Sequence, residues 1–197
     1  MAKPAKKAAG ASFMEPVPIQ SLLPINVGLS PAQEATMISI LGSPSVPLTT
    51  ACQNGKASAK VKHLQETRKI TDVFRLTGIK PALDSIQTVL AKVFAANPGL
   101  EAVLSTEGML CVRRRKPTNG SVSHKLSNHS WGTAVDFKIV GFEAPGNTKQ
   151  NVPKFIALMI PHFNKEGWLS GIAFNDSMHF EIADETVKKM SAAGKFN

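Results

Sequence analysis

Tyrosine is absent from this sequence, and aromatic residues make up only 6% of its 197 residues. The basic cluster from Arg113 to Lys116 contains no aromatic residue. Proteins that bind single-stranded nucleic acid usually combine basic grooves with aromatic side chains on which the bases stack. These two features argue against nucleic acid as a partner.

Long apolar runs are missing as well. No segment approaches the ~20 apolar residues that cross a bilayer, so we expect no membrane span. The first 18 residues carry lysines but lack the apolar block of a secretory signal. We therefore expect no signal peptide.

Cysteine is scarce, since the chain has only Cys52 and Cys111 and no CxxC motif. A zinc site built on thiolates is therefore excluded. The two cysteines could form one disulfide. For a chain without an export signal, however, we expect two buried free thiols.

Acidic residues are few, 14 against 23 lysines and arginines, which gives a net charge of +9. Such a charge favours polyanionic surroundings, and with nucleic acid disfavoured these are anionic lipid or the anionic polymers of a bacterial envelope. Part of the charge lies in residues 1–15, which we expect to form a disordered basic tail.

The patterning of the remaining chain predicts both helices and strands. A first helix is predicted from a capping box at Ser30 to Gly42. Apolar spacing and turn residues predict two further helices and several strands. The helices are expected at residues 81–96 and 152–164, and the strands within residues 100–115, 133–140 and 167–183.

One stretch, SNHSWGTAVDFKI, raises a chemical question. Val135, Phe137 and Ile139 alternate toward one face of a predicted strand, which leaves Asp136 on the opposite face. His129 lies seven residues upstream, so the chain must fold back at Gly132 for the two to meet. On its own this spacing does not distinguish a metal site from a strand carboxylate with an unrelated loop histidine.

A second stretch, FNDSMHFEIA, favours the metal site over an unrelated carboxylate and histidine. His179 and Glu181 project from the polar face of another strand, and the turn-forming residues around Asp176 can redirect its carboxylate. Two histidines and one carboxylate are a suitable ligand set for catalytic zinc, with a fourth position left for water. A further carboxylate close to the metal, for which Asp176 is placed, would move the water's proton.

The first stretch matches the pattern SxHxxGxAxD through Ser127, His129, Gly132, Ala134 and Asp136. Asp176, His179, Phe180 and Glu181 match a second pattern, D/ExxHFE. Together these resemble the zinc D-alanyl-D-alanine carboxypeptidases and L-alanyl-D-glutamate endopeptidases, a family that includes the vancomycin-resistance dipeptidases and many phage endolysins. The resemblance covers about residues 80–185. It therefore assigns residues 76–197 to a zinc peptidase domain and leaves residues 16–75 as an N-terminal extension of unknown role.

The resemblance implies an α+β fold with a small antiparallel sheet flanked by helices and a zinc site on the sheet face. It implies one Zn²⁺ per chain, bound by His129, Asp136 and His179, with Asp176 as the catalytic base. Glu181 is expected to support a metal ligand by a hydrogen bond.

Three further residues are assigned to substrate binding. Ser127 is expected to hydrogen-bond the substrate. Arg113 is the candidate for the substrate-holding arginine that relatives carry in the sequence SGYR, with Arg114 and Arg115 as rivals. Trp131 is counted among the candidates for the substrate groove, although a place in the core is the preferred interpretation. His124 is a rival ligand or oxyanion donor, although we expect a solvated loop histidine.

The predicted function is a zinc metallopeptidase that hydrolyses a stem-peptide bond of peptidoglycan. Aspartate at the position of the base resembles the L-alanyl-D-glutamate endopeptidases, so this bond is favoured. The alternatives are a D-alanyl-D-alanine carboxypeptidase and a non-catalytic zinc domain that binds the cell wall or a partner. The protein is expected to act on the bacterial wall, and the endolysin resemblance suggests a phage product released from the cytoplasm at lysis.

Overall fold

A four-stranded antiparallel sheet lies at the centre of the computed structural model, which describes residues 4–45, 49–52, 55–116, 123–145 and 150–197. Its strand order is β4-β5-β8-β7. These strands are β4 (Leu104–Gly108), β5 (Ala134–Ile139), β7 (Trp168–Ser170) and β8 (His179–Ile182). The predicted α+β fold with a small antiparallel sheet is confirmed.

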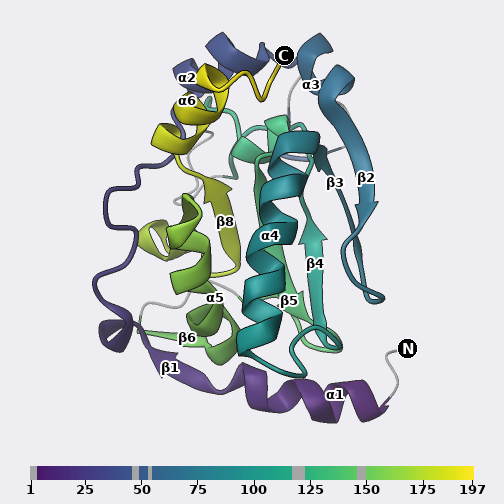
Figure 1. The fold of residues 1–197 in the computed structure, drawn as a ribbon, viewed down its shortest axis with the longest axis vertical. Helices are drawn as coiled ribbons and strands as arrows, with labels where there is room; N and C mark the ends of the chain where they lie inside the picture. The colour runs from purple at the N-terminus through teal and green to yellow at the C-terminus, as the bar shows by residue number, and fades with distance from the viewer. Residues whose placement is uncertain (1–3, 46–48, 53–54, 117–122, 146–149) are drawn as a thin grey trace.

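Two helices cover one face of this sheet, α4 (Lys80–Ala96) and α5 (Lys154–Lys165) (Figure 1). The sheet side chains Phe137 and Phe180 contact Phe163 of α5, with ring centroids 5.7 Å and 4.4 Å apart. This aromatic cluster fills the core on one side of β5 and β8. Strand alternation therefore turns Asp136 and His179 to the other side of the sheet.

The predicted helices in this half of the chain are present. Apolar residues at helical spacing bury one face of α4, and the helix ends at Asn97 as expected. Helix α5 begins slightly later than predicted, because Val152 belongs to β6 (Asn151–Pro153). This short strand pairs with β1 (Pro16–Pro18).

The N-terminal residues differ from the expected disordered tail. Pro4–Ala11 form α1 and Ser12–Met14 form the 3₁₀ helix η1, at the opposite end of the molecule from the C-terminus (Figure 1). Gly10 is buried, and a Cβ built there would lie 2.5 Å from Ile139. Phe13 and Met14 pack on the main core. Apolar contact with the sheet therefore orders a segment whose composition predicted disorder.

The extension contributes to the same core as the domain. It contains η2 (Ile19–Leu22), α2 (Glu34–Leu41), α3 (Ala59–Leu64) and β2 (Gln65–Lys69). Strand β2 forms a hairpin with β3 (Arg75–Ile79), which crosses the expected boundary. Met37, Leu41 and Val61 are fully buried in the core cluster that also holds the central sheet. Whether residues 76–197 fold as a separate domain stays a prediction.

Helix α2 starts at Glu34, later than the capping box predicted, although it ends at Gly42 as expected. The residues before it are engaged elsewhere. The Ser30 amide donates to Glu185 and the Gln33 amide to Asp184, both in α6 (Asp184–Ala192). These contacts hold the proposed capping residues in an extended path beside α6.

The expectation of free thiols is wrong, because Cys52 and Cys111 form a disulfide. The segment before Cys52 lies alongside the one after Cys111, where the Arg114 amide donates to the Thr49 carbonyl at 2.7 Å. This pairing brings the two cysteine Cα atoms to 5.1 Å. Among the described residues, no helix is both long and apolar enough to span a bilayer.

Candidate metal centre

Three potential ligands converge on the polar face of the sheet. Asp136 of β5 and His179 of β8 are directly paired in register. His129 comes from the 3₁₀ helix η3 (Asn128–Trp131), which ends at Gly132 in the left-handed region with φ 63°. The predicted reversal at Gly132 is therefore present, and it returns the chain from His129 into β5.

The donor atoms of these residues lie close enough to share one ion. Asp136 Oδ1 is 2.9 Å from His179 Nδ1 and 3.2 Å from His129 Nε2. The two imidazole nitrogens are 3.3 Å apart. The ligands of a tetrahedral zinc lie ~2.0–2.2 Å from the metal, which places them roughly 3.3–3.6 Å from one another. The donor set and its spacing therefore fit zinc after a small expansion.

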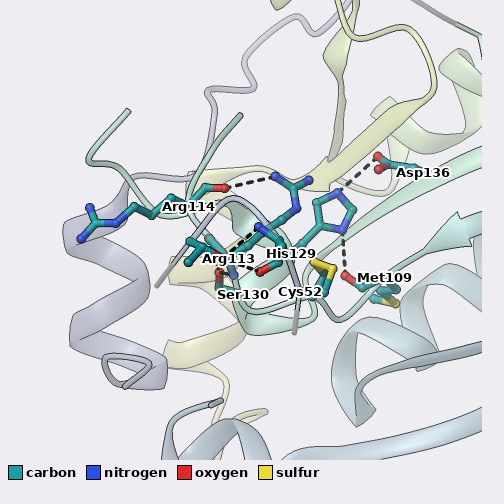
Figure 2. The surroundings of a disulfide bond; sticks show 10 residues. Cys52, Met109, Arg113, Arg114, His129, Ser130 and Asp136 are labelled. Atoms are coloured by element: carbon teal, nitrogen blue, oxygen red, sulfur yellow. Dashed lines mark hydrogen bonds and ion pairs between the residues drawn. A yellow bond between two sulfur atoms is a disulfide. The ribbon is translucent and has the colours of Figure 1, made fainter. Parts of the chain in front are cut away.

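Each histidine is fixed in the orientation that a metal ligand needs. His129 Nδ1 donates to the Met109 carbonyl at 2.8 Å, which leaves Nε2 free to bind (Figure 2). His179 Nε2 donates to Glu181 Oε2 at 3.0 Å, which leaves Nδ1 free. Such outer contacts set the tautomer and raise the basicity of metal-bound histidines. Glu181 thus contacts a candidate metal ligand, as the sequence predicted.

The electrostatics of the site call for a positive charge at its centre. Burial disfavours the charged form of His179, but its hydrogen bonds to Asp136 and Glu181 prevail and raise its pKa to about 10. Burial also opposes ionisation of Asp136, yet hydrogen bonds to both histidines hold its pKa well below the usual range. A divalent cation would supply the charge that the proton provides here.

Asp176 lies beside this cluster, on the turn between the 3₁₀ helix η4 (Gly171–Phe174) and β8. Its amide donates to the Gly171 carbonyl and its carbonyl accepts from the His179 amide. This turn supplies the bend that the sequence required at Asn175 and Asp176. Burial raises the pKa of Asp176, and the charge of His179 acts against that rise.

Arg113 is the arginine of the basic cluster that faces the site. Its guanidinium is partly buried, which lowers its pKa, and the carboxylates of Asp136 and Asp176 oppose that effect. Figure 2 shows it on the side of the His129 ring, whereas Arg114 extends the other way. The two alternative arginines are bound to the neighbouring loop, since Arg114 donates to the His124 carbonyl and Arg115 to the Leu126 carbonyl.

The backbone around Arg113 is tied to the metal segment. Ser130 Oγ donates to the Arg113 carbonyl at 2.9 Å and accepts from its amide at 3.1 Å. The Ser127 amide also donates to the Arg113 carbonyl, and Ser127 is buried next to the ligand helix. These bonds hold Arg113 in a fixed place relative to His129. His124 is exposed on its loop, as expected.

The assignment of Trp131 to the substrate groove is wrong. The side chain is fully buried, and its Nε1 donates to the Gly42 carbonyl at 2.8 Å. Trp131 therefore packs in the core against the end of α2, which was the preferred interpretation. The sequence gave no signal of this contact across 89 residues.

The sequence reasoning missed four residues around the site. Met109 holds His129, while Asn128 and Ala32 donate to Glu181 at 2.7 Å and 3.1 Å. Phe174 is 40% exposed, and its ring centroid lies 5.6 Å from that of His179. Only Asn128 and Phe174 had a visible signal, because they stand next to the two recognised motifs.

Comparison with known proteins supports a peptidase. A family model described as D-alanyl-D-alanine carboxypeptidase matches residues 121–182. The matched segment contains the three candidate ligands together with Asp176 and Glu181, and it ends before α6. A search of curated proteins found no match. At a coarse level, the match supports a zinc peptidase that acts on peptidoglycan, with zinc implied by the family rather than shown directly.

Proposed function

We propose that this protein is a zinc-dependent peptidase that cuts the L-alanyl-D-glutamate bond of peptidoglycan stem peptides. The observation that carries the proposal is the convergence of His129, Asp136 and His179, with Asp176 beside them. Such a set provides both a metal centre and a separate carboxylate for proton transfer.

The donors for the metal are His129 Nε2, Asp136 Oδ1 and His179 Nδ1. When bound there, zinc would lower the pKa of water and polarise the scissile carbonyl. Asp176 takes the proton of the attacking water and delivers it to the leaving amine. A carboxylate whose pKa is raised by burial is better suited to this exchange near neutral pH than one with an ordinary pKa.

Arg113 binds an acidic or carbonyl group of the substrate. Its cation lies beside Asp136 and Asp176, so it can hold a substrate group next to the reacting bond. Ser127 would add a hydrogen bond from the ligand segment. The net charge of +9 gathers the protein at the anionic wall, and salt weakens this accumulation. The disulfide fits such a location, since disulfides persist in oxidising surroundings.

The choice of bond rests on the aspartate at position 176, which resembles the L-alanyl-D-glutamate endopeptidases. The second candidate is a D-alanyl-D-alanine carboxypeptidase, which the description of the matching family model favours. Release from a host cytoplasm at phage lysis is a part of the proposal that rests on the endolysin resemblance alone.

Mass spectrometry of digested peptidoglycan tests the proposal. Zinc-loaded protein should release fragments that begin at D-glutamate, and the metal-free protein should release none. Asp176→Ala should lower turnover by about 10²–10⁴-fold, the usual effect of losing general acid–base catalysis, while zinc stays bound. Loss of a terminal D-alanine instead would establish the carboxypeptidase. A folded, zinc-bound protein that releases nothing from several wall types would contradict both and favour a binding domain.

A further inference from the structure

The segment Ser30–Gln33, here called the strap, is the part of the extension that reaches the back of the metal centre. It lies outside the segment that the family model matches. Figure 1 shows the chain before α2 running along the edge of the molecule to reach α6. The Ser30 and Gln33 amides donate to Glu185 and Asp184, and the Asp184 amide donates back to the Ser30 carbonyl. The first turn of α6 thus fixes the strap from both sides.

The strap reaches the metal centre through Glu181. The buried Ala32 amide donates to Glu181 Oε1 at 3.1 Å. Asn128 Nδ2 donates to Glu181 Oε2 at 2.7 Å and lies 3.4 Å from the Ala32 carbonyl. Together with His179 Nε2, these groups give the carboxylate three donors. Glu181 is 4% exposed, so its orientation depends on them.

Asn128 is the buried side chain that lies between the strap and Glu181. The residue is 3% exposed, and within the described part of the chain its Oδ1 has no hydrogen-bond partner. A buried acceptor without a partner is unfavourable, and an apolar side chain of similar size would avoid it. This cost is offset by the Nδ2 bond to the buried Glu181 carboxylate, which an apolar side chain could not make.

We propose that Asn128 and the strap are positioning elements of the metal centre. They hold Glu181 where it keeps His179 Nε2 protonated and Nδ1 directed at the metal. The extension is thereby a working part of the enzyme, although it lies outside the recognised domain. The inference rests on the proposed zinc site but not on which bond is cut.

Asn128→Leu tests the first part, because it keeps the branching of the side chain and removes the bond to Glu181. We expect zinc affinity, measured by competition with a chelator, to fall about tenfold, the lower end of the range for outer contacts of metal ligands. The zinc-free variant should still unfold cooperatively with a melting temperature only slightly below that of the wild type, because loss of the Nδ2 bond is partly offset by removal of the unpaired Oδ1. The visible spectrum of the Co²⁺-substituted variant should change, since the ligand geometry is altered. Zinc affinity within twofold of the wild type would overturn the proposal.

Glu185→Ala tests the strap from the surface, and it remains informative if Asn128→Leu does not fold. Loss of the Ser30 contact should lower zinc affinity about threefold, a modest coupling through packed elements. Glu143→Ala, on the loop after β5, removes the same charge from an exposed residue and serves as the matched control. Equal zinc affinity in the two variants would contradict a role for the strap.

The two proposals can fail separately. A wild type that binds zinc through this network but cuts no stem peptide would refute the proposed function and leave the positioning role intact. A wild type that cuts stem peptides, with zinc bound equally well by Asn128→Leu, would refute only the positioning role.

Discussion

At the residue scale, the candidate centre depends on two histidines that are held in opposite ways. His129 offers Nε2 because a backbone carbonyl takes its Nδ1, and His179 offers Nδ1 because a carboxylate takes its Nε2. The motifs predicted which residues meet, but not which nitrogen each presents. That choice is made by Met109, 20 residues before His129, and by Glu181, two residues after His179 on the same strand.

The pH dependence of hydrolysis tests the role of Asp176. Activity needs its carboxylate, whose pKa is raised above the ordinary 3.8, so kcat/KM should be lost on acidification at a pH above that value. The Arg113 cation opposes this rise. Arg113→Gln should therefore move the acidic limb to still higher pH and also raise KM.

Arg115→Gln is the matched control for this shift, because Arg115 is bound to the neighbouring loop. The control should keep the wild-type profile. An acidic limb that moves equally in both variants would show a general effect of net charge. It would contradict a direct electrostatic effect of Arg113 on Asp176.

At the element scale, strand alternation is the part of the site that the sequence predicts well. Val135, Phe137 and Ile139 are fully buried and Asp136 faces the other side, as the period-2 pattern indicated. The strap and the disulfide could not be predicted in this way. Ala32 and Glu181 are separated by 149 positions, and no local pattern encodes such a contact. Propensity at Ser30 favoured a helix cap, and tertiary contacts with α6 prevailed.

The geometry of the ligands depends on the backbone conformation of Gly132. Its φ is 63°, and an added Cβ would lie 3.0 Å from Gly78 Cα. Gly132→Ala should lower the free energy of unfolding by more than the ~1–2 kcal/mol of the left-handed backbone alone, because the methyl group also meets β3. Zinc affinity should fall with it, since η3 must shift.

Gly99→Ala is a matched control, with φ 90° and no atom within 4 Å of the added Cβ. It should show only the backbone cost. Denaturant unfolding of the two variants measures the difference. Equal destabilisation would mean that the close approach to β3 is unimportant.

The disulfide links two segments 59 residues apart, and the Cys111 amide donates to the His129 carbonyl. Closing a loop of this length stabilises the folded state by up to about 4 kcal/mol on a chain-entropy estimate. Reduction should therefore lower the melting temperature, and Cys52→Ser should do so equally without reductant. A melting temperature that is insensitive to reductant would contradict a structural role for the bond.

At the scale of the whole molecule, one core joins the extension and the recognised domain. Met37 and Leu41 of α2 are buried with the central sheet, and Trp131 bonds to the end of α2. The sequence predicted the fold class and the ligand set through two motifs and the family resemblance that they carry. It did not indicate that residues of the extension share a core with the central sheet, because burial that joins distant segments leaves no periodic signal.

The most direct test of the account is zinc content and hydrolysis measured together on three proteins. The wild type should bind one zinc per chain and hydrolyse a stem peptide. Asp176→Ala should bind one zinc and hydrolyse the peptide about 10²–10⁴-fold more slowly, and His129→Ala should bind none and be inactive. This separation of metal binding from turnover is what the geometry predicts. A His129→Ala protein that keeps its zinc, or an Asp176→Ala protein that keeps full activity, would contradict the assignment of the centre.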